Sequence, residues 1–461
     1  MKFQKYILIT LMCLTLFSCD DMVEVDFPDD RITSTAVFSK NETANSAVVG
    51  IYNQLFRVAF SSGFQTSVTA LGGLSADNIQ ATVSNSNLLE FEENEIFINN
   101  SYNQGIWSSA YNTIYMANSV LERLDNNNQI SEELKERLIG EASFIRAFTY
   151  FYLVNLYGDV PLVLTTDYQS NAMINRTDKV QVYNQIIEDL ELAVDFLGTT
   201  YDEGERLRAN SYTASALLAR VHLYLENWEF AEQFSTEVIN ASELFELVPI
   251  EEVFLANSKE AIWQISPVAG GSNNTNTNEG ALFIMENNRG SIALTESFLT
   301  SFDTVDARLD KWVGRFDSEE TSYFFPHKYK VKNSTEDRSE YSMVLRLAEQ
   351  YLIRAEARAE QGKLLEAIQD LDKLRIRANL DPIANRYSDI SNEELLDLIL
   401  LERRRELFVE WGHRWLDLKR LDKATEVLSS VKLLWQDTDL YYPIPEDELR
   451  KNPNLTQNPG Y

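Results

Sequence analysis

Cys19 lies where a covalent modification can be predicted from its neighbours. Two lysines precede an apolar run over 6–17, which is too short to span a bilayer and is typical of a signal peptide. The residues Leu16-Phe17-Ser18-Cys19 then have the form of a lipobox, in which the signal is cleaved before the cysteine and the thiol is acylated. A plain secretory signal that leaves an unmodified thiol is the alternative.

The predicted cleavage leaves a chain with one thiol. Cys13, the only other cysteine, lies within the signal peptide over 1–18, so the mature chain cannot form an internal disulfide. Acidic residues crowd the positions after Cys19, and we predict a solvated tether over 19–30. Acyl chains contribute about 0.8 kcal/mol per buried methylene, so lipidation would anchor the protein to a membrane without crossing it.

Few residues indicate catalysis or metal binding. His222, His327 and His413 are the only histidines, and none has a second histidine three or four positions away, so we predict no metal site. Without a Gly-rich phosphate loop or a GxSxG motif, we also predict no cofactor and no catalytic residue. The 71 acidic residues leave one alternative open, a surface glycoside hydrolase with paired carboxyl groups. The net charge of −30 argues against nucleic acid as a partner.

Aromatic and amide side chains gather in two stretches that lack helical periodicity. The first, 60–105, is rich in Ser, Asn and Thr, and the second, 244–338, includes strand-like pieces over 260–265 and 322–331 and an Asn-rich loop over 270–280. Flat rings and hydrogen-bonding amides are what a carbohydrate-binding surface needs. Loops on a helical scaffold commonly carry such surfaces, although any single ring here could equally belong to the core.

Most of the remaining chain has the periodicity of amphipathic helices. Helices are predicted over 42–56 and 107–124, and a third begins near Ser131 and stops at Gly158. Glycine suits the residue after a helix because it adopts positive φ without a Cβ penalty.

Paired helical runs repeat along the chain. The segments 214–240 and 348–374 each contain two runs joined by a turn, with alanines twelve positions apart on the facing sides. These alanine pairs are Ala219 with Ala231 and Ala355 with Ala367. Small residues allow two antiparallel helices to approach closely, which is typical of a tetratricopeptide unit. A third, weaker unit is predicted to pair 141–157 with 180–197.

The stretch 402–420 is the most highly charged. Arg403, Arg404 and Arg405 could form an anion site, but opposite charges recur three or four positions apart and nearly cancel locally. We therefore predict structural ion pairs within and between helices, with Trp411 and Trp415 packed beneath. The residues expected to pair are Glu402, Glu406, Arg414 and Asp417.

Three passages carry a family resemblance. They are 141–162 (EASFIRAF through LYGDVPL), 402–420 (ERRREL through GHRWLDLKR) and 442–461 (YPIP through NPNLTQNPGY). Together with Cys19, their order and spacing resemble the SusD/RagB outer-membrane lipoproteins of Bacteroidota over nearly the whole mature chain.

The resemblance implies a mostly α-helical fold: a tetratricopeptide-like helical-repeat scaffold with irregular loops and a few short strands. It implies one SusD-like domain over 31–461. This domain would comprise an N-terminal half over about 31–243, a loop and strand insertion over about 244–338, and a C-terminal half over about 339–461.

The resemblance also implies a function. A SusD-like lipoprotein is expected to bind a glycan, an oligosaccharide or a peptide at the cell exterior and to deliver it to a SusC-like TonB-dependent transporter, without catalysis. The ligand site is expected to form from 60–105 and 244–338. The candidate ligand-binding residues are Asn78, Tyr102, Asn274, Asn276, Phe283, Tyr323 and Phe324.

Overall fold

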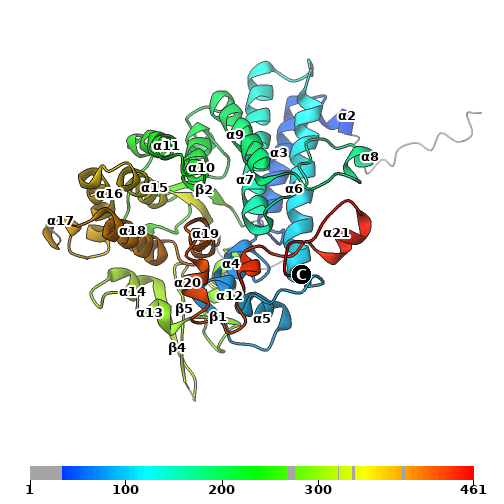
Figure 1. Cartoon of the computed structure of the whole chain (residues 1–461). Coiled ribbons are helices and arrows are strands. Elements are labelled where there is room, and N and C mark those ends of the chain that lie inside the picture. Colours follow the sequence, from blue (N-terminus) through cyan, green and yellow to red (C-terminus); the bar gives the residue numbers. More distant parts are fainter. Residues whose placement is uncertain (1–33, 268–275, 320, 335–337, 387–389) are drawn as a thin grey trace, which may run out of the picture.

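The computed structural model describes residues 34–267, 276–319, 321–334, 338–386 and 390–461. Helices dominate it, as predicted (Figure 1). The helices of the first half are α2 (Ser34–Val37), α3 (Asn41–Leu55), α4 (Val68–Ser75), α5 (Ser86–Glu93), α6 (Ser101–Leu124), α7 (Glu132–Tyr157), α8 (Tyr168–Asn171), α9 (Lys179–Phe196), α10 (Ser211–Tyr224) and α11 (Trp228–Asn240). The later helices are α12 (Asn278–Phe283), α13 (Glu296–Leu299), α14 (Ala307–Trp312), α15 (Leu347–Glu360), α16 (Leu364–Arg377), α17 (Ile383–Arg386), α18 (Asn392–Glu406), α19 (His413–Arg420), α20 (Ala424–Leu428) and α21 (Glu446–Lys451). Short 3-10 helices are η2 (Asp202–Gly204), η3 (Ile250–Glu252) and η4 (Asp437–Leu440).

The strands of the described residues form antiparallel pairs. The pairs are β1 (Ile79–Ala81) with β3 (Ile292–Leu294), β2 (Ala261–Ile265) with β6 (Ser342–Arg346), and β4 (Val313–Asp317) with β5 (Ser322–Pro326). The strand-like pieces predicted over 260–265 and 322–331 are therefore confirmed as β2 and β5, although β5 ends earlier than predicted.

The predicted helix pairs are confirmed. α10 packs on α11, α15 on α16 and α7 on α9, and α11 also packs on α15, so two of the pairs stack side by side (Figure 1). Each predicted alanine pair lies between its two helices: Ala219 and Ala231 share one apolar cluster, and Ala355 and Ala367 share another. Arg358 adds a polar link between the stacked pairs through an ion pair to Glu232 (2.9 Å).

α7 runs through the largest apolar cluster, whose residues extend along the chain from Phe38 to Ile444. Arg146 on α7 pairs with Asp189 on α9 (2.6 Å), which satisfies both charges at the helix interface. The predicted end of α7 is also confirmed, because Gly158 caps it with φ +74° and ψ −127°.

One prediction about local structure was wrong. The stretch 60–105 is not irregular, because it contains α4, β1, α5 and the start of α6. Every residue of α4 is buried, so this helix has no polar face and its sequence shows no helical period. Trp411 and Trp415 are both buried, as predicted, but Trp411 lies in the link between α18 and α19, with φ +47°. That link contacts α4, where the Trp411 backbone N–H donates to Thr69 Oγ1 (3.2 Å).

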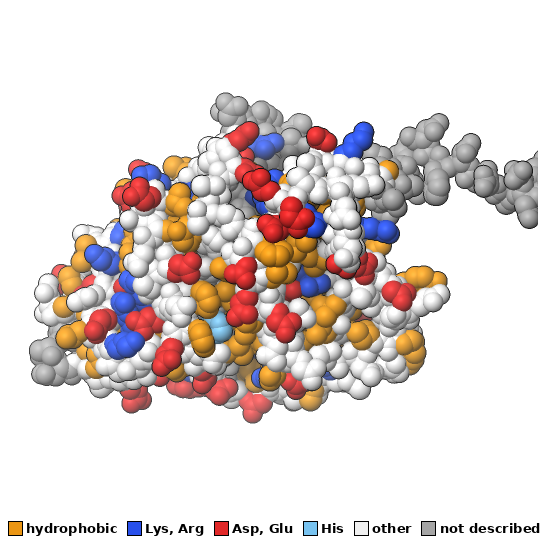
Figure 2. Space-filling model, turned by 90° about the horizontal axis from the view of Figure 1, so that it is seen from above, with side chains coloured by type: hydrophobic (Ala, Val, Ile, Leu, Met, Phe, Trp, Pro, Cys, Tyr) orange, Lys and Arg blue, Asp and Glu red, His pale blue; other side chains and the backbone are white. Residues whose placement is uncertain are grey.

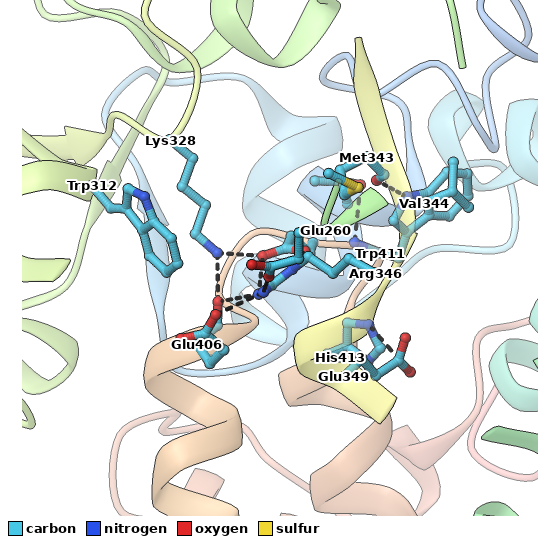
Figure 3. A network of polar contacts seen from close by, with 12 residues as sticks. Glu260, Trp312, Lys328, Met343, Val344, Arg346, Glu349, Glu406, Trp411 and His413 are labelled. Carbon is cyan, nitrogen blue, oxygen red and sulfur yellow. Dashed lines mark hydrogen bonds and ion pairs between the residues drawn. The ribbon is translucent and has the colours of Figure 1, made fainter. Parts of the chain in front are cut away.

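The structural role predicted for 402–420 is confirmed by a buried charge network (Figure 3). Arg346 at the end of β6 pairs with Glu260 (2.9 Å), Glu406 (2.7 Å) and Glu410 (2.7 Å). Lys328 joins the network by donating from Nζ to the backbone oxygen of Glu406 (2.7 Å) and by pairing with Glu410. The network therefore ties the β2–β6 strand pair to the C-terminal end of α18.

The alternative of an anion site in this stretch is not supported. Each arginine of the run already pairs with a carboxylate: Arg403 with Asp417 (2.8 Å), Arg404 with Asp77 (2.7 Å) and Arg405 with Asp303 (3.6 Å).

Candidate functional site

Strand pairing brings the two polar stretches together. β1 lies in 60–105 and β3 in 244–338, and the two pair with Ile79 opposite Leu294. The pairing continues past the strands, where Thr82 donates from its N–H to Ser291 O (2.9 Å) and from Oγ1 to Gly290 O (2.7 Å). A loop over 286–291 is thereby held against the first stretch.

α12 holds a second loop in place, the one that carries Phe64. Asn278 on α12 donates from Nδ2 to Phe56 O (3.0 Å) and to Ser62 O (2.9 Å), which ties the loop to the helix. On its other side α12 lies directly against the chain at Val331. A Cβ on Gly280 would stand 2.3 Å from Val331 O, so only glycine permits this approach.

These segments enclose a pocket of about 510 Å³. Its lining residues are Phe64, Val83, Ala281, Leu282, Ile284, Asn288, Arg289, Gly290, Ser291 and Lys332. The Phe64 side chain is 41% exposed, which is unusual for a large apolar ring and leaves its face available to a ligand. An exposed ring beside amide and cationic donors is the combination that holds a sugar by stacking and hydrogen bonding.

The β4–β5 hairpin reaches the pocket through a contact with Arg289. Arg289 Nη1 donates to the Tyr323 hydroxyl at 3.5 Å, and the Tyr323 ring packs on a small cluster that contains Met285 and Phe325. In Figure 1 this hairpin projects away from the body of the molecule. Phe324, the next residue of the strand, points to the opposite face, where the Arg315 guanidinium lies 6.0 Å from its ring centroid.

The other predicted site residues lie apart from the pocket surface. Asn78, Asn276 and Phe283 are buried, and Asn78 accepts a hydrogen bond from Arg404 Nε (2.8 Å). Tyr102 is half-buried, and its hydroxyl accepts from Gln65 Nε2 (2.9 Å), so it supports the loop that carries Phe64. These residues are therefore placed to hold the segments around the pocket in position, and not to contact a ligand in it.

Two predicted residues, Cys19 and Asn274, lie outside the described residues.

None of the residues that line the pocket was among the predicted site residues, and the three that matter most for binding are Phe64, Arg289 and Lys332. Phe64 lies within the first polar stretch, but nothing local distinguishes it from the aromatic residues that enter the core. Arg289 and Lys332 carried a usable signal, because basic residues are scarce in a chain with 41 Lys and Arg against 71 Asp and Glu.

Glu279 lies behind the pocket, on α12. The side chain is buried against Gly63, accepts a hydrogen bond from Ser342 Oγ, and leaves Oε2 without a hydrogen-bond partner. Burial raises the pKa of Glu279 to about 7, although the Ser342 hydroxyl opposes the shift.

Carboxylates gather at a different cavity. A space of about 520 Å³ beside Tyr52 is lined by Asp202, Glu203 and Glu205 together with Arg208. Asp202 pairs with Arg137 (3.0 Å), so this carboxylate already has a cationic partner.

A third hollow, of about 460 Å³, follows α6 and is lined by Trp107, Tyr111 and Tyr115. Trp107 is buried, so most of its ring belongs to the core.

The surface is consistent with the composition. Acidic side chains are spread across the face seen in Figure 2, among apolar patches, in keeping with the net charge of −30. Within the described residues, no cluster of three or more His, Cys, Asp or Glu side chains could hold a metal ion. None of the helices in the same residues is long and apolar enough to cross a membrane.

Two family profiles match the chain. One, described as starch-binding and associating with the outer membrane, matches residues 28–223, and the other, described as the SusD family, matches residues 315–461. The chain is 27% identical to SusD-like protein P25 of Formosa agariphila, with all of both chains covered. It is 35% identical to the starch-binding protein SusD of Bacteroides thetaiotaomicron over 26% of this chain and 21% of that one.

Solved structures share the fold. A SusD superfamily protein from Bacteroides vulgatus superposes with a TM-score of 0.78 at 22% identity, covering 92% of this chain and 99% of that one. A laminarin-binding SusD-like protein superposes with a TM-score of 0.78 at 24% identity, covering 92% of this chain and 100% of that one.

Proposed function

The chain belongs to the SusD family, and on that premise we propose that it binds a glycan or oligosaccharide nutrient and delivers it to a SusC-like TonB-dependent transporter without cleaving it. The observation that carries the proposal is the pocket beside Phe64, where an exposed ring lies next to amide and cationic donors at the junction of the two polar stretches. SusD-like proteins are associated with the outer membrane, and glycan binding is what the names of two similar proteins state of them.

Glycan binding at this pocket is tested with a panel of polysaccharides by affinity electrophoresis and calorimetry. Phe64→Ala should weaken binding about tenfold, because it removes a stacking face worth about 1.4 kcal/mol. Phe230→Ala, which removes a 49% exposed ring on α11, is the matched control and should bind as wild type does. If the wild type, Phe64→Ala and Phe230→Ala proteins are retarded equally, the glycan does not bind at the Phe64 pocket.

We propose that a lipid on Cys19 holds the protein at the outer surface of the outer membrane. Cys19→Ala should leave the fold intact and move the protein to the soluble fraction, while Phe64→Ala should stay with the membrane. A Cys19→Ala protein that remains membrane-bound after high-salt washing would contradict the anchor.

Delivery requires a partner barrel. Purification of the native complex in gentle detergent should recover a large TonB-dependent transporter together with this protein. Recovery of the lipoprotein alone would count against the transporter partnership and leave glycan binding untouched.

The absence of catalysis is also part of the proposal. None of the described residues that line the Phe64 pocket carries a carboxyl group, so the pair that glycoside hydrolysis needs is not found there. The glycoside hydrolase alternative would use carboxyl groups elsewhere, such as Asp202, Glu203 and Glu205 at the cavity beside Tyr52, or Asp159, Asp178 and Asp437 at another hollow. Incubation with the same polysaccharide panel should release no reducing ends, and release that Glu203→Gln abolishes would favour the hydrolase.

We further propose that 31–461 folds as one SusD-like domain, with halves over about 31–243 and 339–461 joined through the insertion. One apolar cluster that draws residues from Phe38 to Ile444 supports this. A single cooperative unfolding transition is expected by calorimetry.

A further inference from the structure

The Phe64 pocket has a charge opposite to that of the chain around it. Two of its lining residues, Arg289 and Lys332, are basic and none is acidic, although Asp and Glu outnumber Lys and Arg by 71 to 41 over the chain. A local positive field in an otherwise negative protein concentrates anions at that point.

Neither cation is neutralised within the part of the chain that the structure describes. Most arginines in the described part of the chain pair with carboxylates, and several of them do so in the interior, as in the network around Arg346. Arg289 instead is exposed and contacts the neutral hydroxyl of Tyr323, and Lys332, which is half-buried, has no ion pair there. A guanidinium that meets only a phenol keeps its remaining donors free for a ligand.

The backbone fixes both cations at the pocket. Asn288 Oδ1 accepts from the Gly290 N–H (3.2 Å) and Gly290 O accepts from Thr82, so the turn that carries Arg289 is held on both sides. Lys332 follows Val331, which lies directly against α12. The two basic side chains and the Phe64 ring therefore line one hollow from three separate segments.

We propose that this pocket selects an acidic glycan, one whose sugar rings carry a carboxylate or a sulfate ester. Phe64 stacks on a ring face, Arg289 donates paired N–H groups to the planar or trigonal oxygens of the anion, and Lys332 adds a second positive charge. This proposal deepens, and rests on, the proposed function, because it names the class of glycan for the same pocket.

The test compares polymers that differ only in charge. One arm uses polygalacturonate against its methyl ester, and the other uses sulfated laminarin against laminarin, so that carboxylate and sulfate are distinguished. In at least one arm the acidic member should bind about tenfold or more tightly than its neutral partner, as two charge-assisted contacts imply. The preference for the acidic polymer should shrink as the salt concentration is raised from about 0.05 to 0.5 M. Over this range the Debye length falls below about 10 Å, so salt screens the attraction between the pocket and the anionic groups.

Variants assign the preference to the pocket. The double variant Arg289→Gln/Lys332→Gln should lose the preference for the acidic polymer by about five- to tenfold. Phe64→Ala should weaken binding of charged and neutral polymers alike. The control pair Arg123→Gln/Lys373→Gln removes two exposed basic residues on α6 and α16 and should leave the preference unchanged.

The outcomes separate this proposal from the one it rests on. Equal binding of charged and neutral members, or a preference that survives the double variant, overturns the acidic-glycan assignment while glycan binding stands. Failure of every polymer to bind overturns the proposed function and this proposal together.

Discussion

Replacing Glu406 by glutamine should cost this protein a large part of its stability. The Glu406 carboxylate is fully buried and meets Arg308 (2.9 Å), Arg346 (2.7 Å) and Arg377. Glutamine keeps the shape of the side chain but removes the negative charge, so these guanidinium groups lose a buried counter-charge. Breaking a buried ion pair costs about 3–5 kcal/mol, and we expect a loss of that size in the free energy of unfolding.

The effect should depend on pH with a defined sign. Burial alone would raise the pKa of Glu406, but Arg377, Arg346 and Arg308 together hold it well below its usual value. A depressed pKa means that the folded state favours the ionised form. The resulting stability is present above the unfolded pKa of about 4.3 and is lost as pH falls through the folded pKa. The gap between wild type and Glu406→Gln should therefore narrow below about pH 4.

Urea denaturation followed by tryptophan fluorescence at several pH values measures both the loss in the free energy of unfolding and its dependence on pH. The matched control is Glu246→Gln, which breaks an exposed pair with Lys259 (3.4 Å; side chains 62% and 65% exposed). It should change stability by no more than about 0.5 kcal/mol. If Glu406→Gln unfolds within about 1 kcal/mol of wild type at pH 7, the network is not the stabilising element we infer.

Two further changes test the fold, beside the Cys19→Ala and Phe64→Ala tests of anchoring and binding. Gly158→Val should destabilise the protein by about 1–3 kcal/mol, because φ +74° with ψ −127° is available essentially only to glycine; an unchanged melting temperature would reject this account of the α7 cap. Glu279→Gln should flatten the pH profile of stability: a folded pKa of about 7 makes the wild type lose stability as pH rises from the unfolded pKa through 7. The variant should gain up to about 3 kcal/mol relative to wild type between pH 5 and 8.5, and parallel profiles of the two proteins by urea denaturation would argue against a buried, protonated Glu279.

The helical scaffold could be predicted because its signals are local. The alanine pairs lie within one helical hairpin and the glycine that ends α7 acts on the helix just before it, and the structure keeps both. The charges around Glu406 are structural, as predicted, but the partners of Glu406 are Arg308, Arg346 and Arg377, which lie 29 to 98 positions away. α4 could not be predicted, since burial on every side removes the polar face that makes a helix visible in a sequence. The link at Trp411 was missed because its positive φ depends on contacts with α4.

The candidate site was predictable in kind but not in detail. Residue types pointed to the two polar stretches, and the pairing of β1 with β3 brings those stretches together. Which side chains line the pocket depends on how α12 lies against Phe56, Ser62 and Val331, and no local pattern encodes that. Asn78 shows the difficulty: its type suits a ligand, yet Arg404 already occupies its side-chain oxygen.

The bond from Thr82 to Gly290 joins positions 208 residues apart. Such a contact cannot form before residue 290 has been synthesised, so a fragment that ends before this position lacks one wall of the Phe64 pocket. Because the pocket is built from distant parts of the chain, a sugar bound there stabilises the folded state as a whole. It raises the apparent free energy of unfolding by RT ln(1 + [L]/Kd). Melting-temperature shifts in a plate of candidate saccharides are thus a direct route to the natural nutrient.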